Sequence, residues 1–514
     1  MFSSKAGTGF ARNLRHDMFE RVQSFAFENI DKFSSSSLVT RMTTDVNSVQ
    51  MAFMMLTRIA VRAPLMLIFS ITMAYIMGGA LATSFVVIIP VLAFGLIMIG
   101  KKAMPAFRAV FKKYDRMNAS IEENVRAMRV VKGFSREEYE KEKFAVSSDN
   151  IAADFTKAER IVACNMPLMQ LCMYFNMVFV LFVGSRIVVQ SQGSLIKVGQ
   201  ISAMLTYGVQ ILMSLMMLSM IYVMLTMSIE AAKRICEVLD EEPTLHNPVS
   251  PVTEVKDGSI DFCDVSFKYS AAAQKYALSD IDLHIASGMT VGILGVTGSS
   301  KSTLVQLIPR LYDVTEGAVK VGGVDVRDYD LEALREAVAM VLQKNELFSG
   351  TIRDNLRWGN PEASREECEQ ACRIACAHEF IAQMPHGYDT RIEQGGTNVS
   401  GGQRQRLCIA RALLKKPKVL VLDDSTSACD NDTDRLIRSA LAQQLNNVTK
   451  IIISQRISSI KDCDRILVLN NGRMHGWGTH EDLLKGNNLY KEIYSLQNDD
   501  SGDFDDSTRK EGMA

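Results

Sequence analysis

The sequence contains three long stretches without any charged residue, from Ala63 to Gly100, from Ile161 to Ser185 and from Val198 to Ile229. Each equals or exceeds the roughly 20 residues with which a helix crosses a bilayer. The first stretch is long enough for two helices that turn at Gly78 and Gly79. A buried core helix would explain one short apolar run, but not runs of this length. We therefore expect four membrane spans, at about 58–77, 80–100, 161–185 and 198–229.

Other absences narrow the function. The net charge of −1 gives no electrostatic argument for a nucleic-acid partner. No Asp, Glu, Lys or Arg lies in the middle of a span, so an ion-coupled relay has no candidate residues. Residues 1–15 are polar and basic, unlike a cleavable signal. The ten cysteines are scattered, which argues against a disulfide framework, and we expect Cys368, Cys372 and Cys376, near His378, to pack in a core rather than bind zinc.

The distribution of basic residues sets the orientation and the domain boundaries. Arginine and lysine are dense before the first span and after the second, but absent around Gly78, so both long basic segments are expected in the cytosol. Beyond Glu230 the chain is soluble, and from Gly258 short β-rich runs alternate with helices, as in an α/β domain. We expect a membrane domain at 1–235, a linker at 236–257, an α/β domain at 258–497 and a disordered acidic tail at 498–514.

The segment GVTGSSKST, from Gly295 to Thr303, follows a strand-like run and precedes an apolar helical pattern. This context is typical of a phosphate-binding loop, in which backbone N–H groups and the helix dipole hold phosphates, a lysine adds charge and a hydroxyl binds Mg²⁺. Glycine usually precedes the lysine, because the backbone there takes a positive φ, whereas this chain has Ser300. Nucleotide contacts are expected from Gly295, Gly298, Ser299, Ser300, Lys301, Ser302 and Thr303.

Two further motifs follow this loop in order. Residues 418–424 read KVLVLDD, a buried strand that ends in carboxylates, and Asp423 fits the role of a Mg²⁺ ligand. Residues 398–403 read NVSGGQ, a serine and two glycines that open a helix whose N-terminus can bind an anion.

With these motifs in this order, the chain resembles the ATP-binding cassette exporters over almost its whole length. The resemblance implies an all-α polytopic membrane domain of the type 1 exporter kind fused to an α/β phosphate-loop nucleotide-binding domain, with ATP and Mg²⁺ as ligands. It implies that the signature residues contact ATP held by the opposite subunit, that Tyr269 stacks on adenine, that Gln343 contacts Mg²⁺ and that Asp430 signals across a dimer. Metal contacts are expected from Ser302, Gln343 and Asp423, and signature contacts from Ser400, Gly401, Gly402 and Gln403.

The chain departs from the family at positions that touch its own nucleotide. The family's catalytic glutamate is Asp424 here, one methylene shorter, and a base must reach its water within about 3 Å. The family's switch histidine is Gln455, which cannot be protonated, and the acidic residue expected before the signature is Gln394. Asp424, Gln455 and Gln343 remain the expected catalytic residues, in a site that turns over slowly.

Because the signature is intact, we expect a heterodimer in which this subunit holds ATP and completes the site of a more competent partner. A homodimer with neutral drift is the alternative. The expected partners are a second half-transporter subunit, the lipid bilayer of the cell membrane and an apolar or amphipathic substrate, with multidrug export as one expectation. A truncated or regulatory ATP-binding membrane protein without transport is the competing function, and the uncharged spans argue against a soluble DNA-repair cassette.

The resemblance also sets expectations for the membrane domain. Such exporters have six helices per subunit, so the first two are expected to be missing from this chain. The stretches 34–41 and 132–137 are expected at the tips that dock on a nucleotide domain. Methionines at helical spacing favour an adaptable binding surface or ordinary packing. The polar residues of the last two spans are expected to face a cavity or another helix: Gln170, Asn176, Thr206, Tyr207 and Gln210.

Overall fold

The computed structural model describes residues 2–192, 194–270, 273–425 and 428–497, so the expected tail at 498–514 lies outside the described residues. The chain divides into two compact units. One unit comprises residues 1–24 and 34–241, and the other comprises residues 25–33 and 242–514. The short segment 25–33 therefore belongs to the second unit, although its sequence neighbours on both sides belong to the first.

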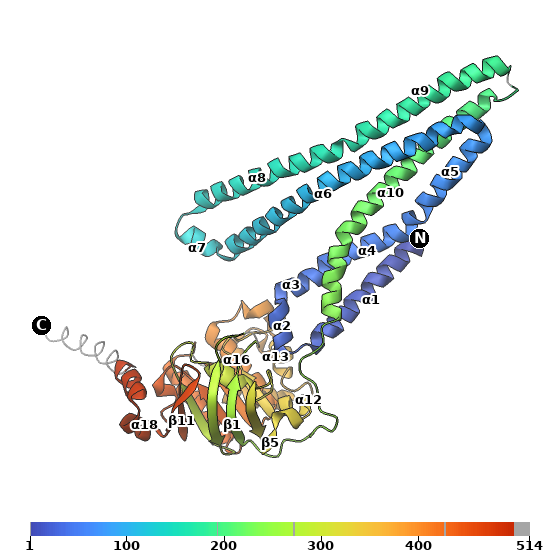
Figure 1. The fold of residues 1–514 in the computed structure, drawn as a ribbon. Coiled ribbons are helices and arrows are strands. Elements are labelled where there is room, and N and C mark those ends of the chain that lie inside the picture. Colours follow the sequence, from blue (N-terminus) through green and yellow to red (C-terminus); the bar gives the residue numbers. More distant parts are fainter. Residues whose placement is uncertain (1, 193, 271–272, 426–427, 498–514) are drawn as a thin grey trace. The chain divides into compact units, whose positions relative to one another are not determined.

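The first unit is helical (Figure 1). Its elements are α1 (Phe2–Ser24), α3 (Ser35–Thr40), η1 (Arg41–Asp45), α4 (Val46–Met55), η2 (Leu56–Ala60), α5 (Arg62–Gly78), η3 (Gly79–Ala82), α6 (Thr83–Arg126), α7 (Met128–Gly133), α8 (Glu137–Ala163), α9 (Asn165–Ser191) and α10 (Val198–Leu239). Helix α6 runs beside α8 and α9, and α5 packs along α10. The turn between α5 and α6 falls at Gly79, whose φ of 50° suits a glycine.

The apolar helices of this unit bury few side chains and expose many. Leu92, Val180 and Met204 form the centre of a small core. By contrast, Phe94 and Phe182 are 70% and 68% exposed. Among the described residues, three stretches are long and apolar enough to cross a membrane, namely Ser35–Phe107, Glu137–Ser191 and Val198–Leu239. The first of them contains both α5 and the start of α6, so the expected helical hairpin around Gly78 is present. Lipid would cover the outward-facing apolar side chains.

The second unit is an α/β domain. Its strands are β1 (Ile260–Phe267), β2 (Leu278–Ile285), β3 (Thr290–Leu294), β4 (Glu316–Val321), β5 (Val324–Asp325), β6 (Val338–Val341), β7 (Gly350–Thr351), β8 (Arg391–Ile392), β9 (Val419–Asp423), β10 (Thr449–Ile453), β11 (Arg465–Asn470) and β12 (Arg473–Gly478). Its helices are α2 (Phe27–Phe33), α11 (Lys301–Gln306), η4 (Val326–Asp328), α12 (Leu331–Ala337), α13 (Ile352–Arg357), α14 (Arg365–Ile374), α15 (His378–Gln383), η5 (Gly387–Asp389), η6 (Gln394–Gly396), α16 (Gly401–Leu414), α17 (Asn431–Gln444), η7 (Ile457–Ser459) and α18 (His480–Gly486).

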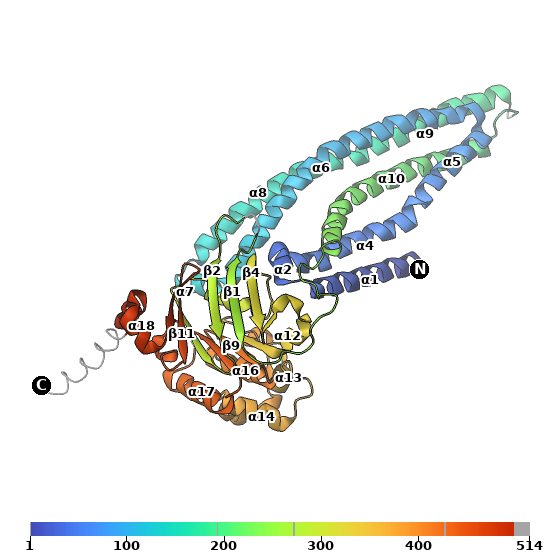
Figure 2. The ribbon, with the colours of Figure 1, turned by 60° about the horizontal axis from the view of Figure 1, so that its bottom comes forward.

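Two sheets build this domain. The larger has the order β12-β11-β3-β10-β9-β6, and all its neighbours pair in parallel except β12 with β11. Every residue of β9 and β10 is buried, as expected for parallel strands that are covered on both faces. The smaller sheet, β2-β1-β4-β5, is antiparallel, and Figure 2 shows β2, β1 and β4 side by side. Strand β2 alternates buried and exposed positions, so one of its faces is covered.

The expected docking segment at 34–41 was misplaced. Helix α2, immediately before it, lies in the α/β unit, while Ser35–Thr40 forms α3 of the helical unit. Asn29 fixes α2 in the α/β unit, since its side chain accepts a hydrogen bond from the Thr244 nitrogen at 3.2 Å and donates one to the Glu242 carbonyl at 3.0 Å. The sequence pattern was ambiguous because α2 is short and polar. At the other expected tip, α7 turns the chain from α6 into α8.

Candidate functional site

The site lies where three parallel strands of the larger sheet end. Ile453 of β10 is the register partner of both Ile293 in β3 and Asp423 in β9. The carboxyl ends of parallel strands form the edge at which open α/β sheets bind ligands. The sheet therefore brings together three segments that are far apart in the sequence: the loop after Leu294, the carboxylates at the end of β9 and the segment that carries Gln455.

The loop from Gly295 to Ser300 connects β3 to α11 and contains tight turns. A Cβ atom at Gly295 would collide with the carbonyl oxygen of Leu469, so this position requires glycine. Gly298 has a φ of 83° and Ser300 a φ of 68°. The left-handed conformation costs a non-glycine residue about 1–2 kcal/mol. Ser300 thus occupies a backbone conformation for which the usual glycine is better suited.

Lys301 is the first residue of α11, and its side chain folds back over the loop. Its Nζ donates hydrogen bonds to the carbonyl oxygens of Gly295 at 2.8 Å and Val296 at 3.0 Å. Burial lowers the pKa of Lys301, although the nearby Asp423 and Asp424 oppose this shift. The ammonium group therefore lies at the mouth of the loop, held by carbonyls that a phosphate group could replace as partners.

Two adjacent carboxylates face this lysine from the end of β9. Burial raises the pKa of Asp423, which is 4% exposed, and a hydrogen bond with Ser302 partly opposes that rise. Burial also raises the pKa of Asp424, while Arg456 and Lys301 oppose it. Asp424 has a φ of 48°, a left-handed backbone conformation directly after the last residue of β9.

These residues line one cavity of about 320 Å³. Its lining consists of Thr297, Gly298, Ser299, Ser300, Lys301, Ser302, Thr303, Gln343, Asp423, Asp424, Ile453 and Gln455. The cavity thus unites the loop with Gln343, Gln455 and the two carboxylates at the end of β9. Thr297 and Ile453 are additions that sequence reasoning missed, and the spacing of the loop would have suggested Thr297.

Tyr269 stands beside the loop and outside the cavity lining. Its hydroxyl shares a 2.8 Å hydrogen bond with the hydroxyl of Thr303. Tyr269 itself is 45% exposed. Burial of the hydroxyl end raises the pKa of Tyr269. A ring with one open face next to a phosphate-binding loop can stack on a planar base.

The signature residues lie elsewhere in the same unit. Ser400 caps α16: its Oγ accepts a hydrogen bond from the Gln403 nitrogen at 3.2 Å, and the Gln403 side chain accepts one from the Ser400 nitrogen at 3.0 Å. Asp430 caps α17 by accepting hydrogen bonds from the nitrogen and the hydroxyl of Thr433, at 2.9 and 2.8 Å, and these hydrogen bonds lower the pKa of Asp430. A second cavity, of about 300 Å³, is lined by Ser400, Gly401, Gly402, Arg406, Ala428, Cys429, Asp430 and Thr433.

The two cavities share no lining residue. The structure therefore separates the expected site residues into a phosphate-loop group and a signature group. Arg406 was missed from sequence, and it brings a cation to the signature cavity. Among the described residues no group of three or more His, Cys, Asp or Glu side chains could hold a metal. In agreement with the packing expectation, Cys368 and Cys372 are 2% and 0% exposed in the core.

Two of the polar residues in the last two spans differ in their surroundings, and whether any of the five faces a cavity stays a prediction. Asn176 is 4% exposed and lies against α6, where the Ser84 hydroxyl donates to its Oδ1 at 3.4 Å. Thr206 bonds to the carbonyl of Ser202 in its own helix. Met213 and Met220 are 50% and 58% exposed, so part of the methionine stripe on α10 is accessible.

Comparisons with known proteins agree with this architecture. Residues 1–229 match the ABC transporter transmembrane region, and residues 278–427 match the ABC transporter family. The chain is 38% identical over 499 residues to an uncharacterized ABC transporter ATP-binding protein of Mycobacterium tuberculosis, covering 96% of this chain and 85% of that protein. It is 31% identical to an ATP-dependent lipid A-core flippase of Desulfotalea psychrophila, with the same coverage of 96% and 85%.

A solved structure extends the likeness to three dimensions. The structure of a bacterial Atm1-family ABC exporter with ATP bound superposes with a TM-score of 0.84 at 28% identity, covering 96% of this chain and 86% of that one. Both the helical unit and the α/β unit thus have counterparts in one exporter. The chain belongs to the ATP-binding cassette transporters, as a multi-pass membrane exporter with a cytoplasmic ATP-binding domain.

Proposed function

We propose that this chain is one half of a heterodimeric exporter whose own ATP site is slow and whose signature completes the site of its partner. The observation that carries this proposal is the distribution of the departures between the two cavities. Ser300, Asp424 and Gln455 all line the phosphate-loop cavity, whereas the signature cavity keeps Ser400, Gly401 and Gly402. Neutral drift in a homodimer would have no reason to spare one cavity.

The separation of the cavities supports a dimer. A complete site in this family needs a phosphate loop and a signature around one nucleotide, and this chain presents them in hollows without a common residue. A second subunit would face each hollow with the complementary motif. The tip at α7 adds support, because Val130 and Phe134 there are 58% and 78% exposed. We propose that a nucleotide domain of the dimer covers this tip.

The residues of the phosphate-loop cavity suit tight binding better than cleavage. The loop amides, Lys301 and Ser302 would hold the phosphates of ATP. Oxygen atoms of Ser302, Gln343 and Asp423 form a donor set that suits Mg²⁺, and the ion, when bound, would neutralise charge that develops on the phosphate. Asp424 is one methylene too short for its expected role as base, and Gln455 cannot gain a proton. ATP on this chain would therefore act mainly as a clamp.

The proposed substrates are apolar or amphipathic compounds. The exposed methionines of α10, including Met213, Met216 and Met220, give an adaptable apolar surface. The relative named as a lipid A-core flippase moves a compound of this class. A regulatory ATP-binding membrane protein without transport is the competing function. Uptake of a fluorescent amphipathic compound into inside-out vesicles that contain the chain and its partner would distinguish the two, because a regulatory subunit would give no ATP-dependent uptake.

The heterodimer proposal is tested by two substitutions in the assembled pair. Asp424→Ala should leave the ATPase rate of the pair almost unchanged, because the partner carries most of the hydrolysis. Ser400→Arg should abolish it, because the bulky cation blocks the cap of the partner's site. Ser364→Arg is the matched control, since Ser364 also caps a helix of this domain, α14, through Glu367. A large loss of ATPase activity with Asp424→Ala would refute the assignment.

A further inference from the structure

Tyr312 is the centre of an aromatic cluster that joins Tyr269 to helix α2. Its ring stands edge-on to the ring of Tyr269, with centroids 5.3 Å apart and an interplanar angle of 89°. Phe267 and Phe27 contact the same ring at centroid distances of 5.6 and 5.9 Å. Edge-to-face pairs of this kind fix the relative orientation of two rings. The side chain of Tyr312 is 9% exposed, so the α/β domain and α2 enclose it almost completely.

The hydroxyl of Tyr312 points toward α2. It donates a 2.8 Å hydrogen bond to Oδ2 of Asp31. Burial and this hydrogen bond raise the pKa of Tyr312, so the hydroxyl keeps its proton and remains a donor at any physiological pH. Asp31 itself is exposed, which means that α2 brings a solvated carboxylate against a buried hydroxyl.

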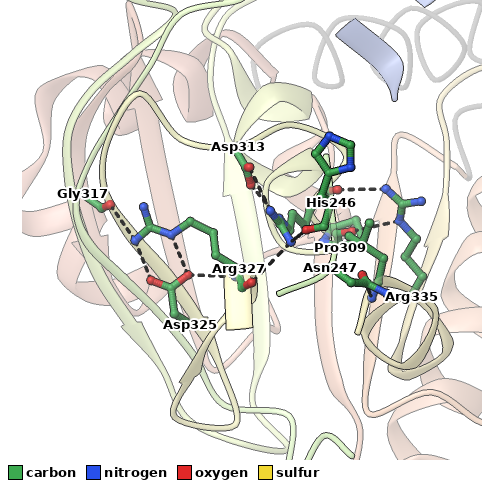
Figure 3. Close-up of polar contacts among 10 residues, drawn as sticks. His246, Asn247, Pro309, Asp313, Gly317, Asp325, Arg327 and Arg335 are labelled. Carbon is green, nitrogen blue, oxygen red and sulfur yellow. Dashed lines mark hydrogen bonds and ion pairs between the residues drawn. The ribbon is translucent and has the colours of Figure 1, made fainter. Parts of the chain in front are cut away.

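Two arginines, Arg310 and Arg335, fix the backbone on both sides of Tyr312; Figure 3 shows Arg335 beside Pro309, with Asp313 and His246 nearby. Arg310 is 5% exposed. Its Nε and Nη2 donate hydrogen bonds to Asp313 at 2.7 and 3.0 Å, and its Nη1 donates one to the His246 carbonyl at 3.2 Å. Arg335 donates to the carbonyls of Pro309 and Arg310, at 3.4 and 3.0 Å. The segment from Pro309 to Asp313 therefore has little freedom, whereas the contacts from α2 depend on the docking of that helix.

Helix α2 is tied in turn to the membrane domain by covalent connection at both ends, through Ser24 and Ser34. If α2 undocks, the buried hydroxyl of Tyr312 loses its hydrogen-bond acceptor and Phe27 moves away from the Tyr312 ring. The ring of Tyr312 can then move. Tyr269 then loses the edge contact that orients it. The hydrogen bond between Tyr269 and Thr303 at 2.8 Å would remain, but it restrains only the hydroxyl end.

We propose that Tyr312 is a positioning residue that links the docking of α2 through Asp31 to the adenine contact of Tyr269. This inference rests on the proposed binding of ATP beside Tyr269. Because coupling between two sites is reciprocal, base stacking on Tyr269 strengthens the docking of α2 by the same factor by which docking strengthens base stacking. Only the base of the nucleotide takes part, so the phosphates bind equally well with and without the link.

The test compares two ligands on the full chain assembled with its partner: Mg-ATP, and Mg-tripolyphosphate, which lacks a base. Tyr312→Phe keeps the ring and removes the hydrogen bond. It should weaken Mg-ATP binding by about three- to tenfold and leave the tripolyphosphate affinity unchanged. Asp31→Ala should give the same loss, and the double variant no further loss, because both changes break one interaction. Asp31→Asn keeps an acceptor oxygen and should restore most of the affinity.

Equal losses for both ligands, additive losses in the double variant, or an unchanged ATP affinity in Tyr312→Phe would overturn the link. Lys301→Ala serves as the control for the phosphate site and should weaken both ligands together. A wild-type pair that binds neither ligand would instead overturn the proposed nucleotide binding itself, so the two failures are distinguishable.

Discussion

The backbone nitrogen of Asp424 donates a 3.0 Å hydrogen bond to the carbonyl oxygen of Ile453. This bond extends the β9–β10 ladder by one residue, and it places Asp424 beside the segment that leads to Gln455. Two residues that depart from the family pattern, Asp424 and Gln455, thus follow the ends of neighbouring strands and line one cavity. A substitution at either residue should therefore affect the same bound phosphate.

Restoring both residues should accelerate ATP hydrolysis at this site. The double variant Asp424→Glu with Gln455→His gains the missing methylene and a side chain that can carry a proton. General acid–base catalysis contributes roughly 10²–10⁴-fold, so we expect at least a tenfold rise in ATP hydrolysis at this site, measured in the assembled pair with the partner's own site disabled. Asp424→Asn with Gln455→His is the control, since it gains the imidazole without a base. Equal rates for the two double variants would contradict the proposed defect.

Ser300→Gly should stabilise the nucleotide domain. It removes a left-handed strain of about 1–2 kcal/mol, and the added freedom of glycine in the unfolded chain takes back roughly 0.5–1 kcal/mol. A net gain of about 0.5–1 kcal/mol in the free energy of unfolding is expected, measured by chemical denaturation. Ser439→Gly, within α17, is the matched control and should lose about 0.5 kcal/mol. A loss in both variants would mean that the positive φ of Ser300 carries no strain.

The ion pair between Arg234 and Asp45 in the helical unit should respond unequally to its two deletions. Arg234 binds both oxygens of Asp45, at 2.8 and 2.5 Å. Its side chain is 51% exposed, whereas that of Asp45 is 2% exposed. Arg234→Ala leaves a buried carboxylate without this partner and should cost about 3 kcal/mol. Asp45→Ala leaves an arginine that can reach water and should cost less, and melting of the two variants in detergent would reveal the order.

The stability of the nucleotide domain should depend on pH through Asp423 with a defined sign. Its folded pKa lies above the ordinary value of 3.8, so the folded state holds the proton more tightly than the unfolded chain. Its contribution to stability is therefore lost as the pH rises from 3.8 through the raised folded value. Asp423→Asn should raise the melting temperature at neutral pH, while Mg-ATP binding weakens.

Asp430 is the control with the opposite sign. Its folded pKa is lowered by the hydrogen bonds from Thr433, so its contribution is present above pH 3.8 and is lost as the pH falls through the lowered value. Asp430→Asn should lower the melting temperature slightly at neutral pH. A fall in melting temperature with Asp423→Asn of the same size would contradict the opposite assignments.

The motifs of the nucleotide domain could be read from sequence because each is short, local and tied to backbone geometry. The glycine of a tight turn at Gly295 and the serine cap at Ser400 need particular residue types, and the apolar runs Val419–Leu422 in β9 and Ile451–Ile453 in β10 favour buried strands. The conformation at Ser300 followed from the same logic, since glycine usually fills that place.

Other features depend on contacts between distant segments and left no local signal. The docking of α2 rests on Asn29 and Asp31, two ordinary polar residues whose partners are more than 200 residues away. The sequence therefore favoured the serine-rich stretch beside it. The division of the site residues into two cavities also depends on where the sheet and α16 lie in space. Amphipathic patterns cannot supply such distances.

The docking of α2 determines which residues a recombinant form of the α/β unit should include. A recombinant fragment that starts at Glu242 would omit residues 25–33 and leave bare the wall against which Phe27 and Asp31 rest. Such a fragment would expose an apolar surface patch next to its nucleotide-binding site, and it would tend to self-associate. Adding those nine residues back as a synthetic peptide, or fusing them through a flexible linker, would cover this surface again and give a fragment better suited to crystallisation.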